Sequence, residues 1–186
     1  MISLQDYHIG LCCDNTRGLK PVASTVCKRQ VWVAPPPNFI KINWDAVVNS
    51  SRGCVGFGLV TRNYNGVFFA AKCIVQSQKI EAKSAEALAA FWAVRFCLEM
   101  EFREVIFEGD AAQVIDDICS TLPHLSSSGH IIESIVHDTY HLTSAKFVHV
   151  KREGNAVPHG LAKLAVDQNL SSCWMVEPIM ENNSGF

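Results

Sequence analysis

Hydrophobic and polar residues alternate along the first part of a domain expected at residues 38–170. Residues 39–46 alternate strictly, which predicts a strand with one apolar and one polar face. Two further strands, at 54–62 and 66–75, flank Asn65-Gly66, a residue pair typical of tight hairpin turns. The domain is therefore predicted to begin with three sequential antiparallel strands.

After these strands, segments with the pattern of a helix alternate with segments that have the pattern of a strand. Residues 81–100 contain no Gly or Pro and are rich in Ala and Leu, which predicts a long helix. The resulting order, βββαβααβα, predicts an α/β fold in which helices flank a mixed five-stranded sheet. The remaining elements are expected to be a strand, two helices, a strand and a helix at residues 104–108, 111–121, 130–141, 145–150 and 156–168.

Proline-rich sequence marks the first boundary of the domain. Ala34-Pro35-Pro36-Pro37 cannot continue a helix or a central strand, so residues 1–37 are interpreted as a poorly structured leader or truncated neighbouring segment. Residues 171–186 are expected to be a loose tail. No apolar run approaches the roughly 20 residues that span a bilayer, and no secretory signal is recognisable. These features predict an intracellular protein, nuclear or cytoplasmic and not secreted, without membrane contact.

Composition and charge limit the possible functions. Hydrophobic residues make up 48% and charged residues 18%, as in a globular protein. The eight cysteines form no Cys-x-x-Cys pair and are interpreted as reduced, mostly buried thiols. The net charge is −2, whereas a protein that holds nucleic acid by electrostatics alone should be basic. A phosphate-binding function would therefore need bound cations.

Three acidic residues are expected to meet in this fold. Asp45 ends the first strand, Asp110 directly follows the fourth, and Glu86 lies on the long helix, facing the strand ends. Sites in open α/β sheets collect at strand ends. Crowded carboxylates repel one another unless cations hold them, and their hard oxygen ligands suit Mg²⁺ or Mn²⁺. Two such ions about 4 Å apart can activate a water molecule and stabilise the leaving oxygen of a phosphodiester.

Each of the three acids also has an ordinary structural interpretation. Asp110 could be the N-cap of the following helix, Glu86 a solvated helix carboxylate, and Asp45 a turn residue. Only their combination with the order of elements favours a metal site over these alternatives.

Four stretches, at residues 36–45, 85–90, 107–110 and 150–155 with 161–165, carry a family resemblance. In order and spacing they resemble type 1 ribonuclease H, particularly the ribonuclease H-like domains of plant retroelements and their domesticated relatives. The resemblance implies a five-stranded sheet, two Mg²⁺ or Mn²⁺ ions held by Asp45, Glu86 and Asp110, and hydrolysis of the RNA strand of RNA–DNA hybrids.

Two features depart from the family pattern. His159 occupies the position of the family's fourth metal-binding acid, where the plant retroelement branch often has histidine. In the first turn of the last helix, after Asn155 as the expected N-cap, a neutral ring could bind a metal or transfer a proton, or could be a spectator. The loop 151–154 lacks the mobile histidine of many members, and segment 121–130 lacks a basic insertion. Slow turnover or weak substrate affinity is therefore expected.

The leading prediction is a monomeric, metal-dependent endonuclease that acts on RNA–DNA hybrids. A catalytically silent nucleic-acid-binding module derived from a retroelement remains an alternative, and so does a protein-interaction domain that uses the apolar helix at 88–98. A hybrid would be recognised by its shape and 2′-hydroxyls. The residues expected to contact it are Asn43, Ser84 and Asn155, with Arg52, Lys151 and Arg152 as phosphate partners.

Overall fold

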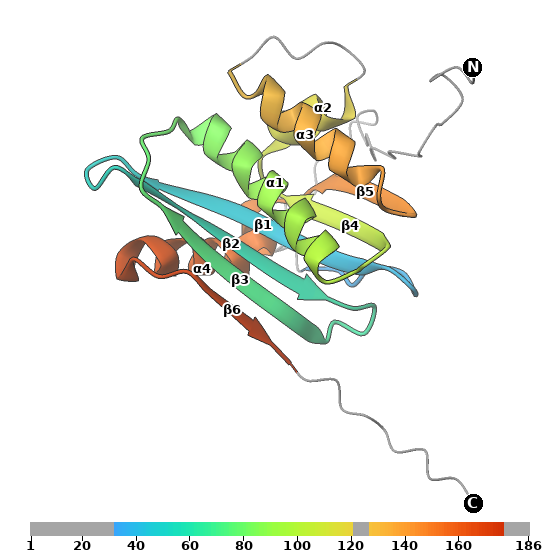
Figure 1. The fold of residues 1–186 in the computed structure, drawn as a ribbon. Helices are drawn as coiled ribbons and strands as arrows, with labels where there is room; N and C mark the ends of the chain where they lie inside the picture. Colours follow the sequence, from blue (N-terminus) through green and yellow to red (C-terminus); the bar gives the residue numbers. More distant parts are fainter. Residues whose placement is uncertain (1–31, 121–126, 177–186) are drawn as a thin grey trace, which may run out of the picture.

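A six-stranded mixed sheet forms the centre of the protein in a computed structural model that describes residues 32–120 and 127–176 (Figure 1). The strand order is β5-β4-β1-β2-β3-β6. The first three strands form an antiparallel meander, and β4 and β5 extend the sheet in parallel from β1. The strands are β1 (Ile40–Asn49), β2 (Cys54–Arg62), β3 (Phe68–Gln76), β4 (Glu104–Gly109), β5 (Ser144–His149) and β6 (Ser172–Met175).

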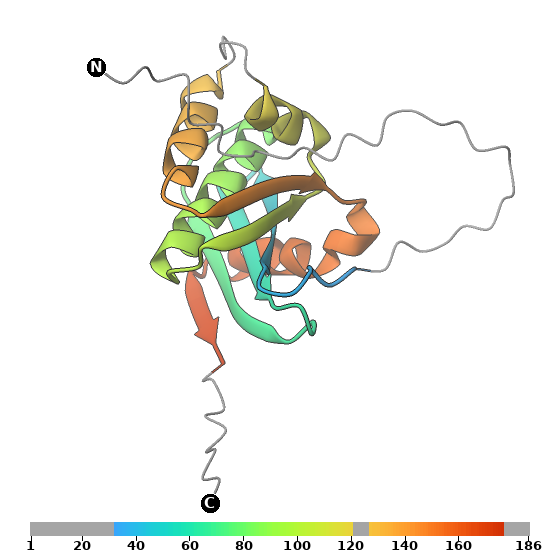
Figure 2. The same ribbon diagram turned by 90° about the vertical axis from the view of Figure 1, so that its right-hand side faces the viewer.

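Helices cover both faces of the sheet. In Figure 1, α1 crosses in front of the strands, close to α2 and α3, and α4 lies behind them. The view turned by 90° shows the sheet between α1 and α4 (Figure 2). The helices are α1 (Ala82–Glu99), α2 (Ala112–Cys119), α3 (Gly129–Thr139) and α4 (Ala156–Gln168), the last preceded by a 3₁₀ turn, η1 (Arg152–Asn155).

The α/β class and the predicted order of elements are confirmed, with one strand added. Residues 172–175, expected to be part of a tail, form β6, which pairs antiparallel with β3. This strand has four residues and is largely exposed, so it lacks the apolar alternation by which a strand is recognised in sequence. The open edge of β3 supplies its hydrogen-bonding partner. Residues 1–31, most of the expected leader, lie outside the described residues.

The two faces of β1 carry different chemistry. Ile42 and Trp44 are fully buried in the hydrophobic core, where the Trp44 ring meets Phe147 edge-on at a centroid distance of 6.2 Å. The alternating positions 41, 43 and 45 project to the opposite face. Buried alanines at 85, 89, 90 and 93 give α1 a small-residue surface toward the core. The polar face of β1 thus remains for a site beside α4.

Two glycines on β2 let α4 lie directly against the sheet. A Cβ atom at Gly58 would meet the carbonyl oxygen of Pro158, and one at Gly56 would meet the carbonyl oxygen of Ala162. Gly58 is paired with Asp45 on β1, so both residues belong to the same face. The close approach therefore brings the first turn of α4 next to Asp45.

None of the helices among the described residues is long and apolar enough to cross a membrane. The thiols of Cys54, Cys73 and Cys97 are free and buried. Burial raises the pKa of the Cys97 thiol to about 12, so this side chain is packed as a small apolar group.

We expect Gly58→Ala to destabilise the protein by about 1–3 kcal/mol, because the new methyl group meets backbone atoms that cannot rotate away. Gly160→Ala is the matched control, since a Cβ atom there meets nothing within 4 Å and alanine favours the helix. Urea unfolding of the two variants measures the difference. Equal stabilities would contradict the close packing of α4 on β2.

Candidate metal centre

Three carboxylates from separate elements meet on the polar side of β1. Asp45 comes from the middle of β1, Glu86 from α1, and Asp110 from the residue directly after β4. One oxygen atom of each carboxylate lies within 4.8 Å of the others. Asp45 is only 3% exposed, and Glu86 and Asp110 are partly buried. The structure thus brings together the three acids that the sequence placed in one site.

The cluster forms where β1 and β4 stop pairing. The parallel pairing runs from Ile40 with Val105 to Asn43 with Glu108, and β4 then ends at Gly109. A Cβ atom at Gly109 would meet the Trp44 indole, so glycine is needed where the two strands separate. Asp45 was predicted to end its strand, but β1 continues to Asn49 through its pairing with β2. Asp45 lies instead just beyond the part of β1 that β4 covers.

Glu86 is the most electrostatically perturbed of the three acids. Its pKa is raised from 4.5 to about 8, first by burial and then by the charges of Asp45 and Asp110. A hydrogen bond from the backbone N–H of Ala46 and the positive charge of Arg152 act in the opposite direction. Its Oε2 atom is buried and has no hydrogen-bond partner among the described residues. One oxygen of this buried carboxylate therefore lacks a hydrogen-bond donor among the described residues.

Asp45 has a partner in α4. Its Oδ2 atom lies 2.7 Å from Nδ1 of His159, whose side chain is 35% exposed. Burial raises the pKa of Asp45 to about 6; the hydrogen bond from His159 opposes this shift, and the Asp110 charge adds to it. His159 therefore lies at the cluster, in the first turn of α4 as predicted.

These observations fit a bound cation. One oxygen of each of the three carboxylates lies within 4.8 Å of the others, and the buried Oε2 of Glu86 lacks a hydrogen-bond donor among the described residues. Asp45, Glu86 and Asp110 could together hold Mg²⁺ or Mn²⁺, ions that prefer carboxylate oxygens. His159, which already contacts Asp45, is near enough to act as an auxiliary ligand.

Neither predicted side-chain cap is formed. Helix α2 begins after Ala111 without a side-chain cap, so the capping interpretation of Asp110 was wrong. Asn155 does occupy the N-cap position of α4, but its side chain makes no capping hydrogen bond. Its Nδ2 atom donates instead to the carbonyl oxygen of Trp44, at 2.7 Å. Neither side chain therefore caps a helix. Asp110 belongs to the carboxylate cluster, and Asn155 bonds to the backbone next to Asp45.

Three of the predicted substrate contacts are exposed or half-buried. Ser84 lies in the first turn of α1, with its hydroxyl 3.1 Å from that of Ser128. Arg152 is exposed and acts on the Glu86 carboxylate electrostatically, and Lys151 is exposed beside it.

The other three predicted contacts make different interactions. Arg52 donates to the carbonyl oxygens of Val166 and Asp167 in the last turn of α4, at the opposite end of that helix from His159. Asn43 and Asn155 are fully buried, and their side chains form internal hydrogen bonds. The structure therefore does not bring Arg52 to the carboxylates and does not expose the two asparagines.

Sequence reasoning missed a buried ion pair beside the cluster, between Lys41 Nζ and Glu108 Oε1 at 2.8 Å. The available signal was a charged residue within each of two predicted strands, Lys41 in residues 39–46 and Glu108 in residues 104–108. Trp32, from the segment before β1, was missed as well because the prolines that follow it suggested a linker.

The profile of the reverse transcriptase-like family matches residues 43–165, which include all three carboxylates. The chain belongs to this family. No curated protein matches it. As a reverse transcriptase-like protein it also shares its fold with ribonuclease H1 structures, which supports the resemblance found in the sequence.

Two solved structures illustrate the likeness. Ribonuclease H1 from the halophilic archaeon Halobacterium salinarum is 17% identical with a TM-score of 0.65, and the match covers 70% of this chain and 98% of that one. LC11 ribonuclease H1, solved in complex with an RNA/DNA hybrid, is 21% identical with a TM-score of 0.62, covering 71% and 99%. At these identities the likeness establishes the ribonuclease H fold.

In the absence of metal, we expect stability to fall as pH rises from about 4.5 to about 8, the ordinary and folded-state pKa values of Glu86. In this window the unfolded chain has lost the Glu86 proton while the folded protein retains it, so the unfolded state binds fewer protons and gains in stability. Each pKa unit corresponds to about 1.4 kcal/mol. Glu86→Gln removes this effect and should be more stable than the wild type in EDTA at the upper end of the window.

Urea unfolding in EDTA across this range measures the difference between wild type and variant. Glu133→Gln, which changes an exposed glutamate on α3, is the matched control and should leave the pH profile unchanged. A constant difference between Glu86→Gln and the wild type at all pH values would contradict the raised pKa.

Proposed function

We propose that this protein is a divalent-metal-dependent endonuclease that hydrolyses the RNA strand of RNA–DNA hybrids. The observation that carries the proposal is the cluster of Asp45, Glu86 and Asp110, with a buried oxygen lacking a donor, in a fold shared with ribonucleases H1. One of these relatives was solved with an RNA/DNA hybrid. All three acids come from one chain, so a monomer suffices for the site.

In this proposal Asp45, Glu86 and Asp110 hold two Mg²⁺ or Mn²⁺ ions. When bound, the ions supply an activated water and stabilise the leaving oxygen of the phosphodiester. The protein contributes a partly buried site in which carboxylates are held at fixed positions on β1, α1 and the end of β4. Lys151 and Arg152, both exposed, bind backbone phosphates, and the Ser84 hydroxyl contacts the substrate.

His159 has a separate role in the proposal. Its Nδ1 atom is hydrogen-bonded to Asp45, which orients the ring and leaves Nε2 available for a metal ion or a proton. This histidine stands where the family pattern has an acid. On that basis we propose that the chain derives from the plant retroelement branch.

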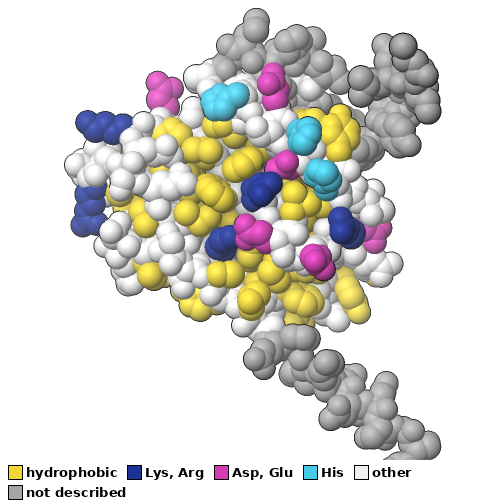
Figure 3. Space-filling view, in the orientation of Figure 1, with side chains coloured by type: hydrophobic (Ala, Val, Ile, Leu, Met, Phe, Trp, Pro, Cys, Tyr) yellow, Lys and Arg dark blue, Asp and Glu magenta, His cyan; other side chains and the backbone are white. Residues whose placement is uncertain are grey.

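The charge of the protein is consistent with dependence on metal ions. The net charge of the whole chain is −2. On the face that carries α1, acidic, basic and histidine side chains are interspersed among apolar ones (Figure 3). Among its described residues, this face therefore offers no continuous basic surface to which a polyanion could bind by side-chain charge alone.

A catalytically silent hybrid-binding module is the second candidate. It is favoured by the loop at 151–154, which has no histidine, and by the burial of Asn43 and Asn155 away from any substrate. The protein-interaction alternative has less support. Phe96 is in the core, and Phe91 and Trp92 pack against each other and against that core.

Asp110→Asn should reduce cleavage of a fluorescently labelled RNA–DNA hybrid in Mg²⁺ or Mn²⁺ by at least about a hundredfold, because loss of a direct ligand should exceed the 10–100-fold cost of losing an outer contact. Asp167→Asn, an exposed aspartate at the end of α4, is the matched control and should retain activity. Single-stranded RNA, duplex DNA and EDTA complete the assay. Hybrid binding without cleavage, equal in metal and in EDTA, would support the silent module instead.

His159→Ala should lower the rate of hybrid cleavage by about tenfold, the lower range for removing a group that contacts a ligand. The Asp45 carboxylate would remain but would lose its hydrogen-bond partner. Steady-state kinetics together with Mn²⁺ titration separate a role in metal binding from a role in proton transfer. If neither the rate nor the Mn²⁺ affinity changes, His159 is a spectator.

A further inference from the structure

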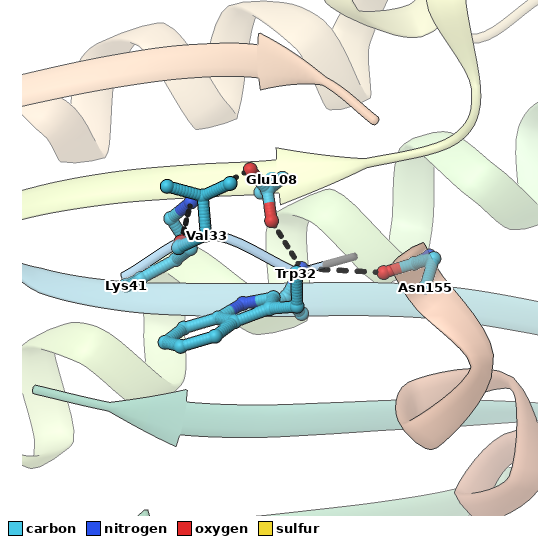
Figure 4. Close-up of polar contacts among 6 residues, drawn as sticks. Trp32, Val33, Lys41, Glu108 and Asn155 are labelled. Carbon is cyan, nitrogen blue, oxygen red and sulfur yellow. Dashed lines mark hydrogen bonds and ion pairs between the residues drawn. The ribbon is translucent and has the colours of Figure 1, made fainter. Parts of the chain in front are cut away.

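A buried polar network lies beside the carboxylates on the same side of β1. Nζ of Lys41 donates to Oε1 of Glu108 and to the carbonyl oxygen of Val33, each at 2.8 Å. Nδ2 of Asn43 donates to the other Glu108 oxygen, also at 2.8 Å. The side chains of the ion pair are only 7% and 8% exposed. Figure 4 shows Lys41 pointing toward both Val33 and Glu108.

The network continues in two directions from Asn43. The indole Nε1 of Trp32 donates to Oδ1 of Asn43 at 2.9 Å. On the other side, Nδ2 of Asn43 lies 3.4 Å from Oδ1 of Asn155, whose own Nδ2 donates to the carbonyl oxygen of Trp44. Every polar atom of the Asn43 side chain is therefore engaged inside the protein.

The Trp32 ring lies near two cationic side chains at the network. Nζ of Lys41 lies 5.4 Å from the centre of this ring, and the Arg62 guanidinium lies 4.9 Å from it. Contacts of this kind attract a cation to the face of an indole. Burial lowers the pKa of Arg62, as expected for a guanidinium partly covered by other groups.

Three members of the network are close in sequence to a residue of the candidate metal centre. Asn43 precedes Asp45 by two residues on β1, and Glu108 precedes Asp110 by two residues at the end of β4. Asn155 directly precedes α4, the helix that carries His159, and it bonds to the carbonyl group adjacent to Asp45. The network thus joins β1, the end of β4 and the start of α4. The relative positions of these segments set the distances among Asp45, Asp110 and His159.

Stability alone is a poor explanation for this arrangement. Removing two charges from water costs as much as their attraction returns in many proteins, and apolar replacements of a buried pair are often neutral or stabilising. By contrast, the two hydrogen bonds that Glu108 accepts from different residues of β1 fix the two strands relative to each other at the point where their pairing ends.

We propose that Lys41, Asn43, Glu108 and Asn155, covered by Trp32, are positioning residues that fix the spacing of Asp45, Asp110 and His159 for metal binding. They act through the backbone of β1, β4 and α4 and do not touch metal or substrate. The metal-binding part of this inference rests on the proposed function. The tethering of the three segments can be tested without any metal.

The test compares two double variants of the full chain. Lys41→Met with Glu108→Leu removes both charges of the buried pair together, and so should fold. Lys72→Met with Glu99→Leu is the matched control, since this ion pair, at 2.6 Å, joins β3 to the far end of α1 from Glu86. Mn²⁺ affinity is measured by titration, thermal unfolding confirms folding, and hydrogen exchange reports on the backbone.

The proposal predicts that the Lys41/Glu108 variant, folded, binds Mn²⁺ about tenfold more weakly, the range found for groups that orient ligands. Hydrogen exchange of segments 104–112 and 150–158 should be faster in this variant, and the control should match the wild type in both measurements. A folded variant with wild-type affinity and exchange would overturn the proposal.

Two further outcomes remain decisive. If the wild type itself binds no Mn²⁺, the proposed function fails, and hydrogen exchange alone then decides whether the network tethers the segments. If the double variant does not fold, Trp32→Phe replaces it, because phenylalanine keeps an aromatic side chain but lacks the indole N–H that bonds to Asn43. Faster exchange and weaker Mn²⁺ binding in Trp32→Phe support the network, and wild-type behaviour overturns it.

Discussion

Mutual repulsion among three carboxylates is the constraint on which the arrangement of this protein depends. Oxygens of Asp45, Glu86 and Asp110 lie within 4.8 Å of one another in a partly buried site. Burial first, and then the neighbouring negative charges, raise the pKa values of Glu86 and Asp45, so without positive charge the cluster favours protonation. The fold must therefore hold the acids together against a force that would separate them, and the surrounding packing is consistent with that requirement.

Close packing supplies much of the rigidity. Glycines at 56 and 58 place α4 against β2, Gly109 leaves room for the Trp44 indole, and buried alanines line the inner side of α1. Contacts made by backbone and small side chains have few alternative rotamers, so the elements they join move little. Asp45 and Glu86 are thus carried by elements held by the core, and Asp110 directly follows such an element. In a site of this kind the carboxylates are already in position before a cation binds.

The sequence was sufficient to predict the α/β fold and the meeting of the three acids, because both depend on strand alternation and on where strands end. It was insufficient where tertiary pairing decides. Asp45 seemed terminal, but β2 extends β1 to Asn49. Strand β6 is too short and exposed to show a pattern. Asn43 and Asn155 were taken for surface residues since their buried partners, Glu108 and the Trp44 carbonyl, come from distant parts of the chain.

The segment before β1 shows how a correct local interpretation can miss a tertiary role. Pro35, Pro36 and Pro37 do exclude a helix or a central strand, which suggested a linker to a separate leader. Yet Pro35 is buried, and the backbone N–H of Phe39 bonds to the carbonyl oxygen of Pro36 in a turn. Proline stiffness makes such a turn less costly to order. The stiff segment thereby places Trp32 and Val33 against β1, where they bond to Asn43 and Lys41. Residues before the prolines are therefore packed against the sheet.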